Sequence, residues 1–138
     1  MIEDDDGHAR LVEKNLCRSS LCDKLIRVNN GQDGLNIIHG RNSNPHWNRS
    51  KELLVLLDLN MPVLDGYSLL QTIKNNPETR AIPVIVMTTT SDAQEIKHCY
   101  DMGCNLYLTK PVDYTKFQQM IHALGEFLKV VSVPVGNQ

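Results

Sequence analysis

The pattern of apolar and polar residues along this chain changes repeatedly between two kinds of segment. Two short runs are almost entirely apolar, LLVLL at 53–57 and IPVIVM at 82–87. A run without alternation suits a strand covered on both faces, as in a parallel sheet. Segments outside these runs carry apolar residues at three-and-four spacing, most regularly after residue 116, which predicts amphipathic helices.

Strands and helices are therefore expected to alternate along the chain. Strands are predicted at 24–28, 53–57, 82–87 and 106–111, and helices at 8–21, 31–39, 67–75, 92–102 and 117–131. Strands separated by helices imply right-handed crossovers, which give a parallel sheet with helices on both faces. The polar segment 40–51 is rich in turn formers and is predicted to be a loop.

Composition narrows the class of protein. With 138 residues and 41% hydrophobic residues, the chain is about one domain long. A net charge of −2 without a basic block argues against a nucleic-acid surface. The apolar runs are too short for a membrane span and the start of the chain is too acidic for a signal peptide, so we expect a cytoplasmic location. The four cysteines lack CxxC spacing and are expected to be reduced.

Polar residues follow the predicted strands at one edge of the sheet. Ligand sites in such folds lie beyond the carboxyl ends of the strands. Those ends carry EDDD at 3–6, Asp58, TTT at 88–90 and Lys110. Acidic groups brought close together are costly to ionise unless a cation lies among them, and oxygen ligands favour Mg²⁺. A metal with open positions, a lysine and a hydroxyl together suit phosphoryl transfer.

The segments IEDDD, LLDLNMPVLDG, VIVMTTT and YLTKP, in this order, resemble the receiver domain of bacterial two-component response regulators. The resemblance covers nearly the whole chain and implies a flavodoxin-like (βα)5 doubly wound sheet of order 2-1-3-4-5. We expect a receiver domain at 1–131, with a loop insertion at 40–52, and a tail at 132–138. Only Met1 and Ile2 precede the acidic residues, so the first strand is largely missing from the chain.

The resemblance also implies a role for individual residues near the metal. Asp58 would accept a phosphoryl group from a phosphohistidine on a sensor kinase. Asp4 would bind Mg²⁺ directly and Glu3 largely through water, with Asp58 and the backbone carbonyl of Asn60 completing the ligands.

Residues after the last two strands would complete the site and its switch. By the resemblance, Lys110 would pair with the phosphoryl group, and its peptide bond to Pro111 is expected to be cis. Thr88 would be the switch hydroxyl and Tyr107 the aromatic that moves with it, although a static core aromatic is the alternative for Tyr107. The histidines, His8 among them, have no metal-ligand spacing and are expected on the surface.

The function implied is that of a signalling switch which catalyses only its own phosphorylation and dephosphorylation. The loop and tail are similar to small stand-alone response regulators that work with phytochromes, so a phytochrome kinase is one candidate partner. Output would then pass through protein contact, homodimerisation or onward phosphorelay, without nucleic acid or membrane. The alternatives are an inactive receiver that serves only as an interaction module and a Mg²⁺-dependent phosphatase with an aspartate nucleophile.

Overall fold

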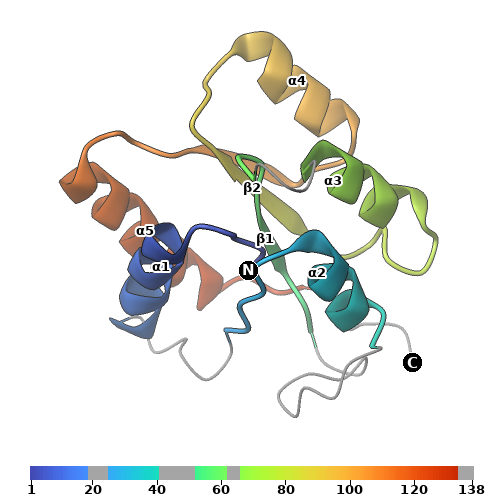
Figure 1. Ribbon diagram of the computed structural model, residues 1–138, viewed down its shortest axis with the longest axis horizontal. Helices are drawn as coiled ribbons and strands as arrows, with labels where there is room; N and C mark the ends of the chain where they lie inside the picture. Colours follow the sequence, from blue (N-terminus) through green and yellow to red (C-terminus); the bar gives the residue numbers. More distant parts are fainter. Residues whose placement is uncertain (19–24, 41–51, 62–65, 134–138) are drawn as a thin grey trace.

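The computed structural model describes residues 1–18, 25–40, 52–61 and 66–133. Helices and strands alternate as predicted (Figure 1). In chain order they are α1 (Asp6–Arg18), α2 (Gly31–Ile38), β1 (Val55–Asp58), α3 (Gly66–Asn75), β2 (Val84–Thr88), α4 (Ala93–Asp101), β3 (Leu106–Thr109) and α5 (Tyr114–Leu128). The predicted loop at 40–52 and tail at 132–138 fall mostly outside the described residues.

The central sheet is parallel. Strand β2 lies between β1 and β3, with Val55 opposite Val84 and Ile85 opposite Leu106. On the other side of β1, Ile2 bridges Leu57 and also Val28, again in parallel. The order is therefore the Val28 segment, the Ile2 segment, β1, β2 and β3, which is the predicted doubly wound order 2-1-3-4-5.

The first strand of this order is reduced to a short bridge, as the sequence predicts. Ile2 donates its N–H to the Leu56 carbonyl, and its own carbonyl accepts from the Asp58 N–H. The strand predicted at 24–28 is correspondingly shortened to a bridge at Val28, because among the described residues only 1–3 pair with it.

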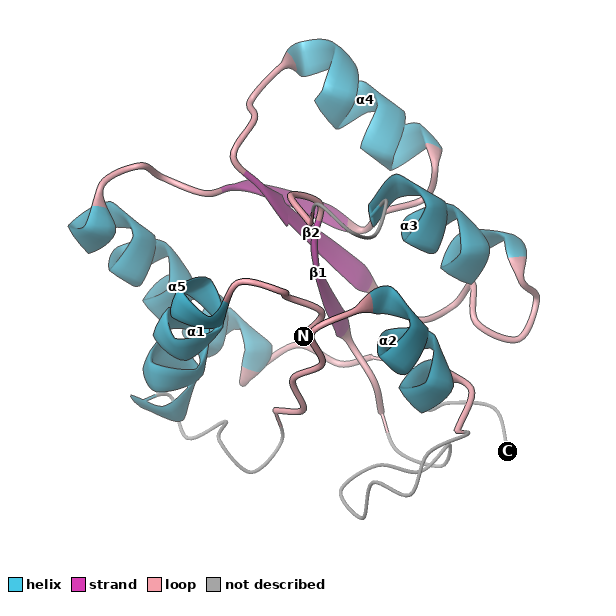
Figure 2. Cartoon of the chain, viewed as in Figure 1, coloured by secondary structure: helices cyan, strands magenta, loops and turns pink. Residues whose placement is uncertain are grey.

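Helices cover both faces of the sheet (Figure 2). Alternate residues of β1 enter different cores: Leu57 packs with α2, α3 and Cys99 of α4, whereas Leu56 packs with α1 and α5. This division explains why the run at 53–57 shows no alternation, since both of its faces are buried. The predicted apolar face of α5 is confirmed, with Phe117, Ile121 and Leu124 buried.

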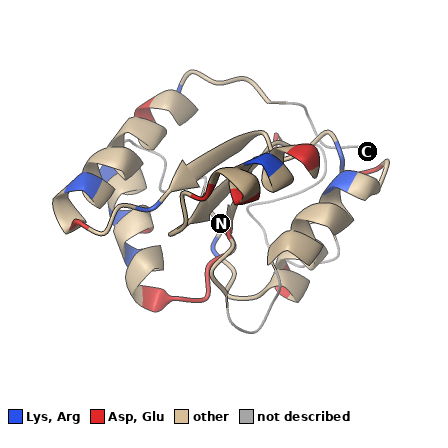
Figure 3. Ribbon diagram, turned by 90° about the horizontal axis from the view of Figure 1, so that it is seen from above, with Lys and Arg blue, Asp and Glu red and all other residues tan. Residues whose placement is uncertain are grey.

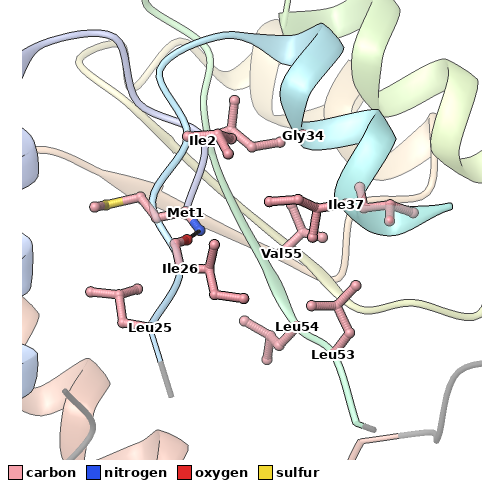
Figure 4. A pocket seen from close by; sticks show the side chains of 11 residues that line it. Met1, Ile2, Leu25, Ile26, Gly34, Ile37, Leu53, Leu54 and Val55 are labelled. Atoms are coloured by element: carbon pink, nitrogen blue, oxygen red, sulfur yellow. Dashed lines mark hydrogen bonds between the residues drawn. The ribbon is translucent and has the colours of Figure 1, made fainter. Parts of the chain in front are cut away.

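An apolar cavity of about 90 Å³ lies where the Ile2 segment begins (Figure 4). It is lined by Met1, Leu25, Ile26 and the start of the 53–55 segment, among others. The Met1 amine is buried there and donates to the Ile26 carbonyl at 2.8 Å. Burial lowers the pKa of this amine to about 5. The end of the sheet opposite the acidic edge is thus apolar and incompletely filled.

One cysteine departs from the expectation of reduced thiols. Cys17 is disulfide-bonded, whereas Cys99 and Cys104 are free and buried. Sequence spacing could not show this, because a disulfide depends on the distance and orientation of two side chains in the fold. Within the described part of the chain, no helix is long and apolar enough to cross a membrane.

Candidate functional site

Four polar side chains meet at the carboxyl edge of the sheet. Asp58 ends β1, Thr88 ends β2, Lys110 directly follows β3, and Glu3 follows the bridging residue Ile2. All four are buried, with exposed fractions of 2% for Asp58, 0% for Thr88, 4% for Lys110 and 0% for Glu3. Buried ionisable groups are uncommon unless they are paired or coordinate a metal, so this edge is the strongest candidate for a functional site.

Lys110 joins the acidic residues. Its Nζ atom lies 3.1 Å from Glu3 Oε1 and 3.1 Å from Asp58 Oδ1. The backbone N–H of Lys110 also donates to the Thr88 carbonyl at 2.7 Å, which ties the residue to the end of β2. The ammonium is therefore fixed between two carboxylates rather than free to sample solvent.

The carboxylate of Asp58 is oriented by the turn that follows it. Asn60 donates its backbone N–H to Asp58 Oδ1 at 2.9 Å. The side-chain oxygen of Asn60 accepts from the Thr89 N–H at 2.8 Å, which links this turn to the residue after β2. Asn60 thus orients the carboxylate of Asp58 through its backbone and connects two strand ends through its side chain.

The surroundings of the two buried carboxyl groups shift their pKa values in opposite directions. Burial raises the pKa of Glu3 to about 8, helped by the hydrogen bond with Asp58. Burial alone would also raise the pKa of Asp58, but hydrogen bonds from Glu3, from the Asn60 N–H and from Lys110 outweigh it and lower that pKa below its usual range. The pKa of Asp58 thus lies below that of Glu3, so Asp58 is the carboxyl group that ionises first and takes the form that a nucleophile requires.

The donor set fits a divalent cation. Glu3, Asp4 and Asp58 each offer one carboxylate oxygen, and these oxygens lie within 4.8 Å of one another. The Oε2 atom of Glu3 is buried without a hydrogen-bond partner, which leaves it available to a metal or to a metal-bound water. All of these donors are oxygens, which favours a hard ion such as Mg²⁺ over zinc.

The two predicted switch residues lie on neighbouring strands. Thr88 is buried, and its Oγ1 accepts from the Thr90 N–H at 3.4 Å. Tyr107, on β3, donates its hydroxyl to the Thr90 carbonyl at 2.8 Å. Burial raises the pKa of Tyr107 to about 12, so the phenol remains protonated and can donate at physiological pH. Both side chains therefore contact the same residue, Thr90.

One predicted feature of the site is wrong. The peptide bond between Lys110 and Pro111 is trans, as are all peptide bonds of the described residues. A trans bond before proline is favoured by about 0.5–1 kcal/mol unless the surroundings select cis. Here Lys110 reaches both Glu3 and Asp58 from a trans bond.

Sequence reasoning missed one residue at this edge. His8, expected on the surface, lies with its Nδ1 atom 3.4 Å from Lys110 Nζ and 3.6 Å from Glu3 Oε1. Its ring stacks on Phe117 of α5, with centroids 6.0 Å apart. The only signal in the sequence is that His8 follows the acidic residues by about one helical turn, in the helix that begins at the site.

No other Asp, Glu, Lys or Arg among the described residues is buried. Lys and Arg are spread over several elements rather than gathered on one of them (Figure 3). The buried group of Glu3, Asp58 and Lys110 therefore differs from the rest of the described chain in both burial and pairing.

Comparisons with known proteins agree with this fold. Residues 1–122 match the model of the response regulator receiver domain. The chain is 31% identical to response regulator Rcp1 of Synechocystis over 97% of its own length and 90% of Rcp1. A Mn²⁺-bound structure of Rcp1 superposes with a TM-score of 0.79 at 29% identity, covering 96% of this chain and 95% of that one.

Two further solved structures are similar over almost their whole length. A response regulator receiver domain from Rhodospirillum rubrum has a TM-score of 0.89 at 44% identity, covering 100% of this chain and 97% of that one. The phosphorylated cyanobacterial phytochrome response regulator RcpA has a TM-score of 0.81 at 31% identity, covering 96% and 94%. A doubly wound parallel sheet with an acidic and lysine-containing carboxyl edge thus defines the class, and the chain belongs to the response regulator receiver domain family.

Proposed function

We propose that this receiver domain is a signalling switch whose phosphoacceptor is Asp58. The observation that carries the proposal is the setting of this one carboxylate. It is 2% exposed, accepts a hydrogen bond from the Asn60 N–H and lies 3.1 Å from the ammonium of Lys110. An oriented carboxylate beside a fixed cation can attack an electrophilic phosphorus atom whose negative charge would otherwise repel it.

The transfer itself is a displacement at phosphorus. An oxygen of Asp58 forms the new P–O bond, while the bond from phosphorus to the donor breaks and the donor leaves with that electron pair. For a phosphohistidine donor the leaving imidazole then takes up a proton. Lys110 would pair with a phosphoryl oxygen, for which its ammonium lies close enough to the acceptor.

Glu3, Asp4, Asp58 and the Asn60 carbonyl are the proposed ligands of Mg²⁺. The clustered carboxylate oxygens and the unpartnered Glu3 Oε2 support this assignment. When bound, the cation supplies positive charge that offsets the repulsion between the carboxylates and the phosphoryl group. The Mn²⁺-bound form of Rcp1 is consistent with a divalent-metal site in this family.

Thr88 and Tyr107 are the proposed readout of phosphorylation. Phosphorylation adds charge and acceptor oxygens at Asp58, which can draw the Thr88 hydroxyl away from the Thr90 N–H. Because Tyr107 is hydrogen-bonded to the same residue, a shift of Thr90 would change the position of the phenol. This would bias the surface formed by α4, β3 and α5 between two states.

The proposed phosphodonor is a sensor histidine kinase in the cytoplasm, with a phytochrome as the favoured candidate. This rests on the similarity to Rcp1 and to RcpA, the latter being a phytochrome response regulator by its description. Output through homodimerisation is supported by exposed apolar side chains near the end of α5, where Val130 is 80% exposed.

A direct test uses acetyl phosphate as a phosphodonor. Wild-type protein incubated with acetyl phosphate and Mg²⁺ should gain the mass of one phosphoryl group, and the label should be lost at alkaline pH as expected for an acyl phosphate. Asp58→Asn should gain nothing, while Asp33→Asn, at an exposed position of α2, should be labelled like wild type. An unlabelled but folded wild-type protein, or labelled Asp58→Asn, would exclude Asp58 as the acceptor.

A further inference from the structure

His8 contributes a third contact to the lysine of the site. It lies in the first turn of α1, beside α5 (Figure 1). Its Nδ1 atom is 3.4 Å from Lys110 Nζ, although 42% of its side chain is exposed. An ammonium can only donate hydrogen bonds, so Nδ1 is the acceptor of this contact in the tautomer that carries its proton on Nε2.

The three N–H bonds of the Lys110 ammonium have three acceptors within the protein. Two are the carboxyl oxygens Glu3 Oε1 and Asp58 Oδ1, and the third is His8 Nδ1. Lys110 is 4% exposed, so little water can replace a missing acceptor. The three contacts come from three different segments, and together they define both the position and the rotation of the ammonium.

His8 is itself held in place by a backbone hydrogen bond and by a ring contact. The backbone N–H of His8 donates to Asp5 Oδ1 at 2.8 Å, which fixes the start of α1. The ring stacks on Phe117, with an angle of 25° between the two planes, and Phe117 is buried in α5. His8 therefore connects the packing of α1 against α5 to the lysine at the reacting centre.

We propose that His8 is a positioning residue for phosphoryl transfer, which acts by orienting the Lys110 ammonium. This rests on the function proposed above for Asp58. Without the Nδ1 acceptor, one ammonium N–H points into a buried space without a partner, and Lys110 turns toward Glu3 or Asp58. The ammonium is then less well placed for an incoming phosphoryl oxygen.

Two substitutions of His8 distinguish the effect of its acceptor nitrogen from the effect of its stacked ring. His8→Phe keeps an aromatic ring on Phe117 but removes the acceptor. His8→Asn places an amide oxygen close to the position of Nδ1 and gives up the stacked ring. His122→Phe, at an exposed position of α5, is the matched control. For each protein we would measure the rate of phosphorylation by acetyl phosphate at saturating Mg²⁺, together with the midpoint of thermal unfolding.

The expected result is a rate about three- to tenfold lower in His8→Phe, and a rate within about twofold of wild type in His8→Asn and His122→Phe. A stable His8→Phe protein that is phosphorylated as fast as wild type would overturn the proposal. So would an equally slow His8→Asn, because the ring rather than the acceptor would then be responsible.

A measurement on the unphosphorylated protein keeps this proposal separate from the function of Asp58. In the ¹⁵N spectrum of the imidazoles above pH 8, we expect His8 to carry its proton on Nε2 and to leave Nδ1 free to accept. A proton on Nδ1 would exclude the contact with Lys110. A wild-type protein that cannot be phosphorylated would refute the role of Asp58, while this spectrum would still decide whether His8 accepts from Lys110.

Discussion

The hydroxyl of Tyr107 donates a hydrogen bond to the carbonyl oxygen of Thr90 at 2.8 Å. Tyr107→Phe removes this donor and keeps the ring, so the free energy of unfolding should fall by about 0.5–1.5 kcal/mol. Tyr114→Phe is the control, because Tyr114 is exposed and its hydroxyl accepts a solvent-exposed hydrogen bond from the Gln118 amide. Urea denaturation of both variants checks this, and equal stabilities would show that the bond to Thr90 contributes nothing measurable.

Much of this fold could be predicted from the sequence, because burial on both faces of a parallel strand leaves a distinct pattern. The run at 53–57 lacks alternation for that reason, and its two faces do enter two different cores. Asp58 and Lys110 were predicted together because the carboxyl ends of parallel strands share one edge of the sheet.

Other features of the site depend on tertiary packing that no local pattern contains. His8 reaches Lys110 only because α1 packs against α5 and its ring stacks on Phe117. The trans bond before Pro111 and the disulfide of Cys17 likewise depend on three-dimensional geometry that residue spacing does not contain. Sequence reasoning therefore predicted that Asp58 and Lys110 lie together, but not all of the contacts around them.

Substitution of a metal ligand should abolish most of the stabilisation against unfolding that Mg²⁺ provides. Wild-type protein should unfold at a higher temperature with Mg²⁺ than with EDTA, and a tenfold excess over the dissociation constant corresponds to about 1.4 kcal/mol. Asp4→Asn should lose most of this effect, because Asp4 is one of the three clustered carboxylates. Asp101→Asn, whose carboxylate pairs with Lys97 on exposed α4, should keep it. An Asp4→Asn protein with the full response to Mg²⁺ would remove Asp4 from the ligand set.

Gly66 allows α3 to begin directly against the end of β1. A Cβ atom at this position would lie 2.7 Å from Leu59 Cδ2 and 3.0 Å from Leu59 Cα, and the backbone atom cannot move aside cheaply. Gly66→Ala should therefore cost about 1–3 kcal/mol of unfolding free energy. Because the same Cβ would approach the Asp58 carbonyl at 3.3 Å, phosphorylation should slow as well. Gln71→Ala, at an exposed position of the same helix, is the control and should leave both quantities nearly unchanged.

The buried amine of Met1 should make stability depend on pH. Its pKa is lowered to about 5 by burial, from an ordinary value of 8.0. Above pH 8 the amine is neutral in the folded and unfolded chains, so it has no effect on stability. Between pH 8 and 5 only the unfolded chain takes up the proton, and folding loses free energy as the pH falls, by an amount on the order of 4 kcal/mol.

Glu3 titrates in the same range with the opposite sign, because its pKa is raised to about 8 by burial. The amine must therefore be isolated by a difference measurement. Acetylation of Met1 removes its charge and places a small group beside the cavity of about 90 Å³. The acetylated chain should exceed the unmodified chain in unfolding free energy at pH 5.5, and the excess should shrink as the pH approaches 8. A difference that is independent of pH would mean that the acetyl group acts by filling the cavity, and that the amine is not held neutral in the folded chain.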